Sequence, residues 1–500
     1  MVMAQDAHPT VVAGVVLLAF AVSGCAGKGA YPSFAVDSIP PFSGSGHAVA
    51  EERWWKEFGD AGLDGEVNLA LTGNFDLTVA LQRLRAARAV TRREASDFFP
   101  DVNGLVDIGH TFQSGQNQTR TTWGLDASYQ LDLWGQIQAR VDAEQFRADA
   151  TEADYHTVAL SLAAEVSRTW FSLIESYAQL DLLDEQLDSN RTAQKNVELR
   201  FATGGSGGSP DVLRQRQLVQ STLEQIIVVK ANIEVLEHQL AVLTGQPPQT
   251  ATYSPGSVFP DLPPLPTTGL PSDLLNRRPD VRRAYLAFSA AERDLEAAVT
   301  DQYPRLNLRA SLVNAAEHPE SLFRDWFLSI GGQLIGPILD GGQRRAEVER
   351  ARAVMHQRFA EYRQTTQIAL QEVEDGLALE RYQIQRIEKL QDQLDLAKLA
   401  SEQLSQRIIT DDASFLDVLS AIQSQQRLQR AMLSARLDLI LIRIGLYLAL
   451  AGDFDTRPDP ATELPETFPV SPPLLPPEPG APESDATEAD EREEEASVDE

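Results

Sequence analysis

The feature that most constrains this chain is the absence of proline between Pro100 and Pro210. Within that interval, residues 137–203 carry apolar side chains at helical spacing. As one continuous α-helix rising about 1.5 Å per residue, this stretch is about 100 Å long, which exceeds the width of a single globular domain. A second stretch of the same kind, residues 344–410, lies in the proline-free interval after Pro337. The 500 residues of the chain therefore indicate an elongated protein rather than several compact domains.

The apolar residues of the first long stretch recur about seven positions apart. A spacing near 3.5 residues predicts a seam along which helices supercoil around one another. Charged and amide side chains fill the positions between, which suits a hollow tube of helices with water on both surfaces. The seam consists of Phe146, Val158, Leu160, Leu162, Val166, Trp170, Leu173, Leu180, Leu183, Leu187 and Val197.

Upstream of that stretch, apolar residues at three- and four-residue steps predict one amphipathic helix from Gly62 to Phe98. A proline two residues later ends the helical pattern. Trp54, Trp55 and Phe58 precede the helix, and we expect these aromatic side chains to be buried against the body of the protein.

Between the helices the apolar period changes from about 3.6 residues to two. Residues 102–134 alternate apolar and polar side chains on either side of a polar segment, Ser114–Thr121, which we expect to be a hairpin loop. A second hairpin is expected at residues 305–336, with poorer alternation. Strands of about ten residues with one apolar face are typical of lipid-facing strands in an outer membrane barrel.

The order helix, hairpin, long helix and helix occurs twice. Asp76 and Gly135 correspond to Asp280 and Gly342, at offsets of 204 and 207 residues. The predicted fold class is mainly α with a small membrane β-barrel, built from two copies of this unit. The repeats span residues 58–250 and 272–454, with a proline-rich linker at residues 251–271.

Four amphipathic strands are too few to close a barrel. An open edge facing lipid leaves backbone groups unpaired in hydrocarbon, so we expect several copies of the chain to complete the sheet. Three copies give twelve strands, whereas two give eight, a barrel too narrow for anything but side chains. The long helices of all copies then lie side by side as a tube that extends the barrel.

The single cysteine, Cys25, follows an apolar run, Val11–Val22. That run is too short to span a bilayer and is typical of a signal peptide, which we place at residues 1–24. The Val-Ser-Gly-Cys sequence that ends at Cys25 resembles a bacterial lipobox, so residues 25–57 are interpreted as a lipidated tether. The first ten residues contain Asp6 and no Lys or Arg, so a free cysteine closing an ordinary signal peptide stays open as the alternative.

Charge and motifs argue against other functions. The chain has 43 Lys and Arg against 73 Asp and Glu, and this excess of acid disfavours nucleic acid as a partner. The seven histidines are scattered without metal-ligand spacing, and no glycine-rich loop follows a strand to hold phosphate. We therefore expect no enzyme activity, no metal and no cofactor. Residues 455–500 are rich in proline and acid, which predicts a disordered tail.

Several motifs, in this order and twice over, resemble the TolC-like outer membrane efflux channels, and especially the lipoprotein (NodT/OprM-like) branch of RND-type efflux systems. The similarity covers roughly Phe58–Gly452. Its most specific parts are AEVSRTWFSL at Ala164–Leu173, NRRPDVRRA at Asn276–Ala284, LDLWGQ at Leu131–Gln136, ILDGGQRRAEVERAR at Ile338–Arg352, and the Asp-Val-Leu triplets at Asp211 and Asp417.

The resemblance implies a homotrimer, with a twelve-stranded barrel in the outer membrane of a Gram-negative bacterium and a helical tunnel projecting into the periplasm. It also implies contact with outer membrane lipid, a periplasmic adaptor protein and an inner-membrane RND-type pump. The expected function is a passive exit duct for small molecules, anchored by the lipid on Cys25.

In this family, acidic residues just after the inter-helix loop form rings that narrow the periplasmic entrance. Asp417 occupies the matching position, but the second acid of the pattern is replaced by Ser420, so Asp411 and Asp412 are the nearby alternatives for charge. The competing interpretation of Asp417 is an ordinary acidic residue in the first turn of a helix, where the macrodipole favours it.

The equivalent turn in the first repeat is glycine-rich. By the same resemblance, Gly204, Gly205, Asp211 and Arg214 are candidates for contact with the adaptor. The competing interpretation is a flexible turn, since glycine allows close backbone approach in either case.

Two alternatives to small-molecule efflux stay open. A structural coiled-coil protein of the cell envelope would need no strands, and the two hairpins argue against it. The outer membrane component of a type I protein-secretion system shares the expected architecture, although the lipobox and the motifs of the lipoprotein branch favour efflux.

Overall fold

The computed structural model describes residues 40–48, 52–113, 116–203, 208–316, 323–407 and 414–450, together with Phe454 and Thr456. The chain divides into two units, residues 1–455 and 456–500, and the description that follows concerns the first. The predicted leader lies outside the described residues, and so does the predicted tail apart from Thr456. So do five of the candidate site residues, namely Cys25, Gly204, Gly205, Asp411 and Asp412.

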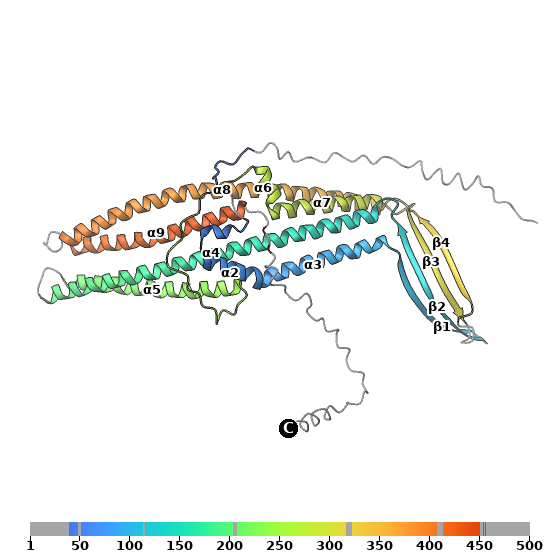
Figure 1. Cartoon of the computed structure of the whole chain (residues 1–500), viewed down its shortest axis with the longest axis horizontal. Coiled ribbons are helices and arrows are strands. Elements are labelled where there is room, and N and C mark those ends of the chain that lie inside the picture. Colours follow the sequence, from blue (N-terminus) through green and yellow to red (C-terminus); the bar gives the residue numbers. More distant parts are fainter. Residues whose placement is uncertain are drawn as a thin grey trace, which may run out of the picture. The chain divides into compact units, whose positions relative to one another are not determined.

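Long helices and one small sheet make up the described part of this unit (Figure 1). The first repeat contains η2 (Trp54–Phe58), α2 (Ala61–Gly73), α3 (Phe75–Ala95), η3 (Ser96–Phe98), β1 (Asp101–Gln113), β2 (Gln116–Leu131), α4 (Gln136–Ala202) and α5 (Ser209–Leu243). The second contains α6 (Pro271–Arg277), α7 (Pro279–Thr300), β3 (Arg305–Ala316), β4 (Trp326–Ile335), α8 (Gln343–Arg407) and α9 (Phe415–Leu450). The prediction of a mainly helical fold with a small β part is confirmed.

The single helix predicted from Gly62 to Phe98 is wrong, because the chain breaks at Asn74. The Asn74 side chain accepts a hydrogen bond from the Leu77 N–H at 3.0 Å, which caps α3, and donates one to the Leu243 carbonyl at 2.9 Å. At Gly73, a Cβ atom would lie 2.6 Å from the Thr244 carbonyl oxygen. The break therefore docks the end of α2 closely against the end of α5.

The helix α4 is the centre of this unit. It packs against α2, α3, α5, α7 and α9, and its middle turns are buried on almost every side, with Ala159, Ala163, Ala164, Val166 and Phe171 fully inaccessible. Small alanine side chains allow neighbouring helices to approach from several directions. The predicted seven-residue seam describes only part of this burial, since a helix with five neighbours needs more than one apolar stripe.

The main hydrophobic core gathers aromatic side chains from distant parts of the sequence. Trp54 and Trp55 are fully buried, and Trp54 stacks on Tyr447 of α9 with ring centroids 5.5 Å apart. Phe58 contacts Phe171 of α4 at 5.0 Å. The aromatic residues that precede α2 are therefore buried, as the sequence predicts, and they join the start of the first repeat to the end of the second.

The motif Asn276–Ala284 forms the joint between α6 and α7. Arg278 is buried and binds both carboxylate oxygens of Asp280, at 3.0 and 2.8 Å. It also lies 2.7 Å from Glu372 of α8 and donates to the Ala449 carbonyl of α9. The motif thus fixes α7 against both helices of the α8–α9 pair.

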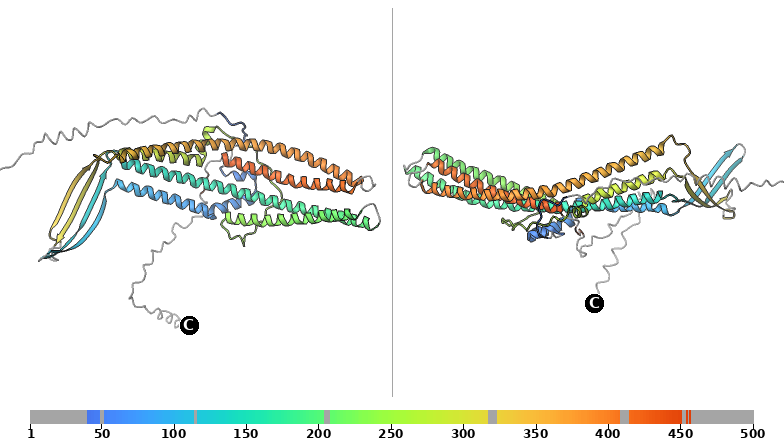
Figure 2. Two further views of the ribbon diagram at one scale, coloured as in Figure 1. Left: turned by 180° about the vertical axis from the view of Figure 1, so that it is seen from behind. Right: turned by 90° about the horizontal axis from the view of Figure 1, so that it is seen from above.

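The four strands form one antiparallel sheet in the order β1-β2-β3-β4. Figures 1 and 2 show the sheet at one end of the long helices, and the end of α4 beside the start of α5 and the end of α8 beside the start of α9 at the other. The predicted loop Ser114–Thr121 is too long, because β2 already begins at Gln116 and pairs with Gln113. Threonine is favoured in strands, so a polar sequence here does not mean a loop.

The register places nearly all apolar strand residues on one face of the sheet. Rows such as Val102, Ala127, Ala310 and Ile330 run across all four strands. The adjacent rows on the opposite face are polar, as in Asn103, Asp126, Ser311 and Ser329. Val106 and Ile330 are more than 70% exposed, so within the described residues the apolar face has no protein cover.

Among the described helices, none combines the length and the apolar character needed to cross a bilayer.

Candidate functional site at the helix tips

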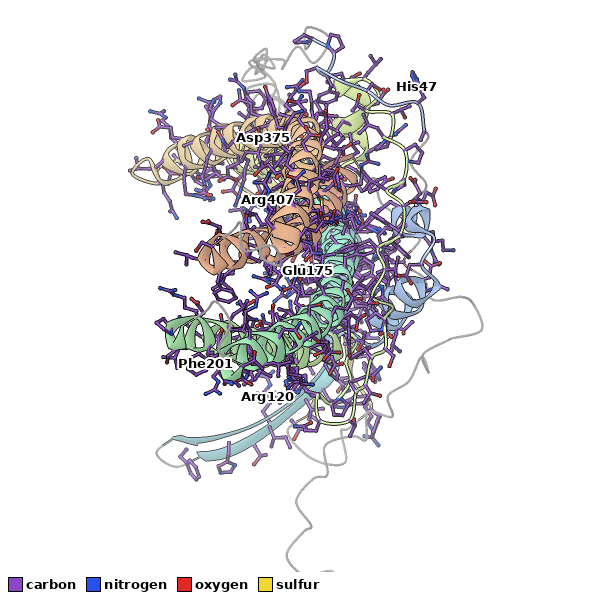
Figure 3. All side chains as sticks on the ribbon, turned by 90° about the vertical axis from the view of Figure 1, so that its left-hand side faces the viewer. His47, Arg120, Glu175, Phe201, Asp375 and Arg407 are labelled. Atoms are coloured by element: carbon purple, nitrogen blue, oxygen red, sulfur yellow. The ribbon has the colours of Figure 1, made fainter. Side chains whose placement is uncertain are left out.

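The candidate gate and adaptor residues lie at the ends of the long helices that are remote from the sheet. We call the ends of α4 and α5 the first tip, and the ends of α8 and α9 the second tip. Figure 3 looks onto this end of the unit, where Phe201 marks the end of α4 and Arg407 the end of α8. The described site residues are Asp211 and Arg214 at the first tip, and Asp417 and Ser420 at the second.

At the first tip, Asp211 stabilises the start of α5. Its carboxylate accepts a hydrogen bond from the Gly208 N–H at 3.2 Å and another from Arg214 Nη1 at 3.2 Å. Pro210 occupies the first turn, where no helical N–H bond is lost. The charge of Asp211 is therefore partly compensated by an arginine of its own helix, and the local geometry is that of a helix cap.

At the second tip, Asp417 has the same sequence context and a different environment. Its backbone N–H donates to the Ser414 carbonyl at 3.1 Å, and its own carbonyl accepts from Ser420 Oγ at 3.0 Å. Its side chain is exposed, and within the described part of the chain no hydrogen bond or ion pair reaches its carboxylate. Among the described residues the carboxylate of Asp417 thus has no partner, and Ser420 supports the helix turn.

The two tips also expose apolar side chains that the sequence interpretation missed. Leu213, in the first Asp-Val-Leu triplet, is 61% exposed, whereas its counterpart Leu419 is 5% exposed. Leu199, Phe201 and Leu416 are at least half exposed as well. Matching the two triplets position by position would have identified Leu213 as a candidate, although only the structure reveals its exposure.

A buried polar network between α4, α5 and α9 was also missed. Asn190 is at its centre: its side chain donates to Thr222 Oγ1 at 3.1 Å and accepts from Gln426 Nε2 at 2.9 Å. Gln215 Nε2 donates to the Asn190 carbonyl at 2.9 Å. Amide side chains at seam spacing, such as Gln179 and Gln186, were the signal in the sequence. This network connects the two repeats through hydrogen bonds rather than apolar packing.

The described residues of the two tips do not form a recognisable catalytic or metal-binding arrangement. Across the residues that the structure describes, no group of three or more His, Cys, Asp or Glu side chains is placed to hold a metal ion. What the tips offer is one exposed carboxylate, one capped carboxylate and a set of exposed leucines, arranged at the end of a bundle whose other end bears an uncovered apolar sheet.

Comparison with known proteins identifies the class to which this combination belongs. The family model described as outer membrane efflux protein matches residues 67–246 and 270–452. The chain belongs to this family of outer membrane efflux channels, in its NodT/OprM-like group, and it is a protein of the Gram-negative outer membrane.

Individual relatives cover most of the chain. The pyoverdine export outer membrane protein OpmQ of Pseudomonas aeruginosa strain PAO1 is 29% identical over 427 residues, which cover 83% of this chain and 90% of that protein. The cation efflux system protein CusC of Escherichia coli strain K12 is 28% identical over 411 residues, covering 80% and 88%. Among solved structures, the outer-membrane channel OprN superposes with a TM-score of 0.77 at 29% identity, covering 84% of this chain and 96% of that one.

Proposed function

We propose that three copies of this chain form the passive exit duct of a tripartite efflux system. The observation that carries the proposal is the sheet, which has one apolar face without cover and two edges without partners among the described residues. Its position at the end of a long helical bundle supports a barrel in the membrane that continues into a helical tunnel.

The physical reason for assembly is the cost of unpaired backbone groups in lipid. Within the described residues, β1 pairs only with β2, and β4 pairs only with β3. Each unsatisfied N–H or carbonyl group in hydrocarbon costs several kcal/mol, so the β1 edge of one copy has to meet the β4 edge of the next. Three copies close a ring of twelve strands, which is wide enough to leave a passage.

The helices supply a second reason for assembly. The helix α8 exposes Leu379, Tyr382, Leu396 and Leu399. Large apolar side chains left exposed along one helix favour an interface with another chain. In the proposed trimer these side chains pack against the neighbouring copy, and the helices of all three copies form the tunnel wall.

The two tips have different proposed roles. The first tip, with Asp211, Arg214, Gly204 and Gly205, contacts a periplasmic adaptor, and its exposed leucines provide the apolar surface for that contact. The second tip forms the gate, in which Asp417 of three copies makes a ring of carboxylates, with Asp411, Asp412 and Ser420 beside it. The like charges of such a ring repel one another, and the ring as a whole attracts cations.

The duct works with an inner-membrane RND-type pump that supplies the energy and selects the cargo. OpmQ is named for pyoverdine and CusC for cations, although both resemble this chain to a similar degree. That contrast supports a conduit whose fold does not determine what passes through it.

The N-terminal region anchors the assembly. We assign residues 1–24 to a signal peptide and residues 25–57 to a tether lipidated at Cys25. The described part of the tether contacts α8, where Ser43 donates from its backbone N–H to Glu374 at 2.8 Å. Beyond the tether, the proposed divisions are the repeats at 58–250 and 272–454, the linker at 251–271 and the tail at 455–500.

Conductance and mass measurements test this proposal together. The purified full chain in detergent should have the mass of a trimer, and in planar lipid bilayers it should form discrete conducting channels. A lone water-soluble monomer, or a trimer that never conducts, would contradict the proposal and favour a structural protein of the envelope. Testing whether it releases small dyes or a secreted polypeptide from the same cells would separate efflux from type I secretion.

A further inference from the structure

A polar groove lies between α5 and α9, about ten residues along α9 from the second tip. Its volume is about 270 Å³, and every side chain that lines it except Leu218 is polar. We call it the α5–α9 groove. The lining that matters here consists of Ser221, Thr222 and Gln225 from α5, and Gln426, Arg427 and Arg430 from α9.

Two arginines in this groove have no acidic partner. Arg427 and Arg430 lie one helical turn apart, and within the described residues no carboxylate is within ion-pair distance of either. Arg430 donates from Nη1 to the amide oxygen of Gln186 at 2.5 Å. Burial lowers the pKa of Arg430, and the nearby positive charge of Arg427 lowers it further. The groove therefore holds two like charges that destabilise each other.

The buried arginines elsewhere in this unit are compensated. Arg278 lies 2.7 Å from Glu372, and Arg443 lies 2.6 Å from Glu380. Both contacts follow the usual rule that a desolvated charge is paired. In a chain with a net charge of -30, acidic residues are plentiful, so two neighbouring cations without one, Arg430 partly buried and Arg427 exposed, indicate a counterion from outside the described chain.

The floor of the groove is neutral and held in place. Gln426 donates to Asn190 Oδ1 at 2.9 Å, and Asn190 donates to Thr222 Oγ1 at 3.1 Å. Asn190, Thr222 and Gln426 are all buried. These hydrogen bonds fix the side chains beneath the arginines, so the surface that a ligand meets is already formed. Binding therefore costs little side-chain conformational entropy.

We propose that the α5–α9 groove binds an oxyanion, namely a carboxylate or phosphate group carried by a small molecule. The planar guanidinium forms paired hydrogen bonds to such groups, and the Ser221 hydroxyl and the amide side chains of the lining can supply further donors. The volume suits one anionic group rather than a whole large cargo. Binding of the anion requires only the helices that form the groove. A role of the groove in transport through the tunnel rests on the proposed channel function.

The groove and the second tip then have opposite electrostatic character. Arg427 follows Asp417 by ten residues, which is about 15 Å along a helix. An anion that is repelled by the carboxylates at the tip would be held by the guanidinium groups further along the same helix.

Binding of inorganic phosphate and of succinate to the purified full chain in detergent tests the proposal, by calorimetry at low ionic strength. The test variant is the double substitution Arg427→Gln and Arg430→Gln. The matched control is Arg436→Gln, an exposed arginine of the same helix that does not line the groove. We expect saturable binding to the parent and to the control, and at least a tenfold weaker affinity in the double variant, with unchanged circular dichroism. Phosphate bound with succinate excluded would identify the phosphate group as the ligand, and the reverse would identify the carboxylate.

Equal binding by the double variant would overturn the proposal. So would a lack of saturable binding to the parent, in particular if a high-resolution map of the assembly shows a carboxylate of a neighbouring copy between Arg427 and Arg430. Because binding is measured in detergent, it can succeed when the channel proposal fails. In bilayers that do conduct, the double variant should shift the reversal potential towards cation selectivity, and Arg436→Gln should not.

Discussion

The two repeats share a sequence pattern, yet their helix pairs are packed differently. In α4, 24 of 67 residues are buried, whereas in α8 only 11 of 65 are. The α4–α5 pair is held by an apolar cluster of Leu183, Leu187, Val219 and Ile226. The α8–α9 pair includes a buried ion pair between Glu380 and Arg443. The first repeat thus contains a central helix and the second a more exposed one, which keeps apolar side chains at its surface.

The largest effect is expected from breaking the ion pair of the second repeat. Arg443 binds both oxygens of Glu380, at 2.8 and 2.6 Å, and also donates to the Pro264 carbonyl at 3.0 Å. Glu380→Ala leaves a buried guanidinium without its partner, which should lower the free energy of unfolding by about 3–5 kcal/mol. Thermal unfolding of the purified protein in detergent measures this loss.

The control for that prediction is Glu347→Ala in the same helix. Glu347 pairs with Arg350 at 2.6 Å, but both side chains are about half exposed. The control should cost less than about 1 kcal/mol. If both variants unfold alike, the buried pair does not distinguish the second repeat from the first.

A somewhat smaller effect is expected from the apolar cluster of the first repeat. Leu183 is 1% exposed, so Leu183→Ala removes packed methyl groups and leaves a cavity, at a cost of about 2–4 kcal/mol. Leu199→Ala, at the exposed end of the same helix, should cost far less. Denaturant titration of both variants provides the measurement, and a Leu183→Ala variant as stable as the parent would show that this cluster does not hold the pair together.

The polar network that joins the repeats should contribute less again. Asn190→Ala removes the hydrogen bonds to Thr222 and Gln426, and leaves buried groups unpaired, at a cost of about 1–3 kcal/mol. The neighbouring Ser189 is exposed, and Ser189→Ala serves as the control. Hydrogen exchange at the start of α5 and in the first half of α9 should report faster local opening in Asn190→Ala only; uniform exchange across both variants would argue against a link between the repeats.

The smallest effect on stability, and the most direct comparison, concerns the two aspartates at the tips. Asp211→Ala removes a helix cap and should lower the free energy of unfolding by about 1 kcal/mol, with little change in conductance. Asp417→Ala should change stability less and raise the leak conductance, because a shorter side chain widens the proposed ring of carboxylates at the entrance. Single-channel recordings of both variants decide this, and equal leak from the two would remove the distinction between gate and cap.

The long helices and the strand-bearing regions are readable from the sequence because their signals are repetitive. Apolar residues at helical spacing without an intervening proline indicate a long helix, and alternation with a period of two indicates a strand with one apolar face. The break at Asn74 was not predicted because its cause is remote: its side chain donates to the carbonyl of Leu243, 169 residues away. The start of β2 at Gln116 was missed because polar residues with high strand propensity resemble a loop in composition.

The candidate site shows the limit of reasoning by position. Asp211 and Asp417 begin identical triplets, so the sequence treats them as equivalent. Their difference arises from Arg214, which reaches Asp211, and from Ser420, which does not contribute a charge. Leu213 and Leu419 differ in exposure for a similar reason, since each depends on what packs beside it. The family and the localisation were predicted from motifs and are confirmed, and the assignment of gate and adaptor residues stays a prediction.

The segment of residues 40–48 limits the distance between a lipid on Cys25 and the sheet. Its backbone bonds to Glu374, which lies 31 residues into α8 and thus about 45 Å along the helix from the sheet. Fifteen residues connect Cys25 with Pro40, and a chain of that length reaches at most about 50 Å. A lipid on Cys25 can therefore lie in the same membrane as the sheet only if the segment from Cys25 to Pro40 is almost fully extended. The proposed tether between Cys25 and Pro40 would then limit how far the sheet can lie from the lipid, and deleting a few of its residues should displace the proposed barrel relative to the bilayer.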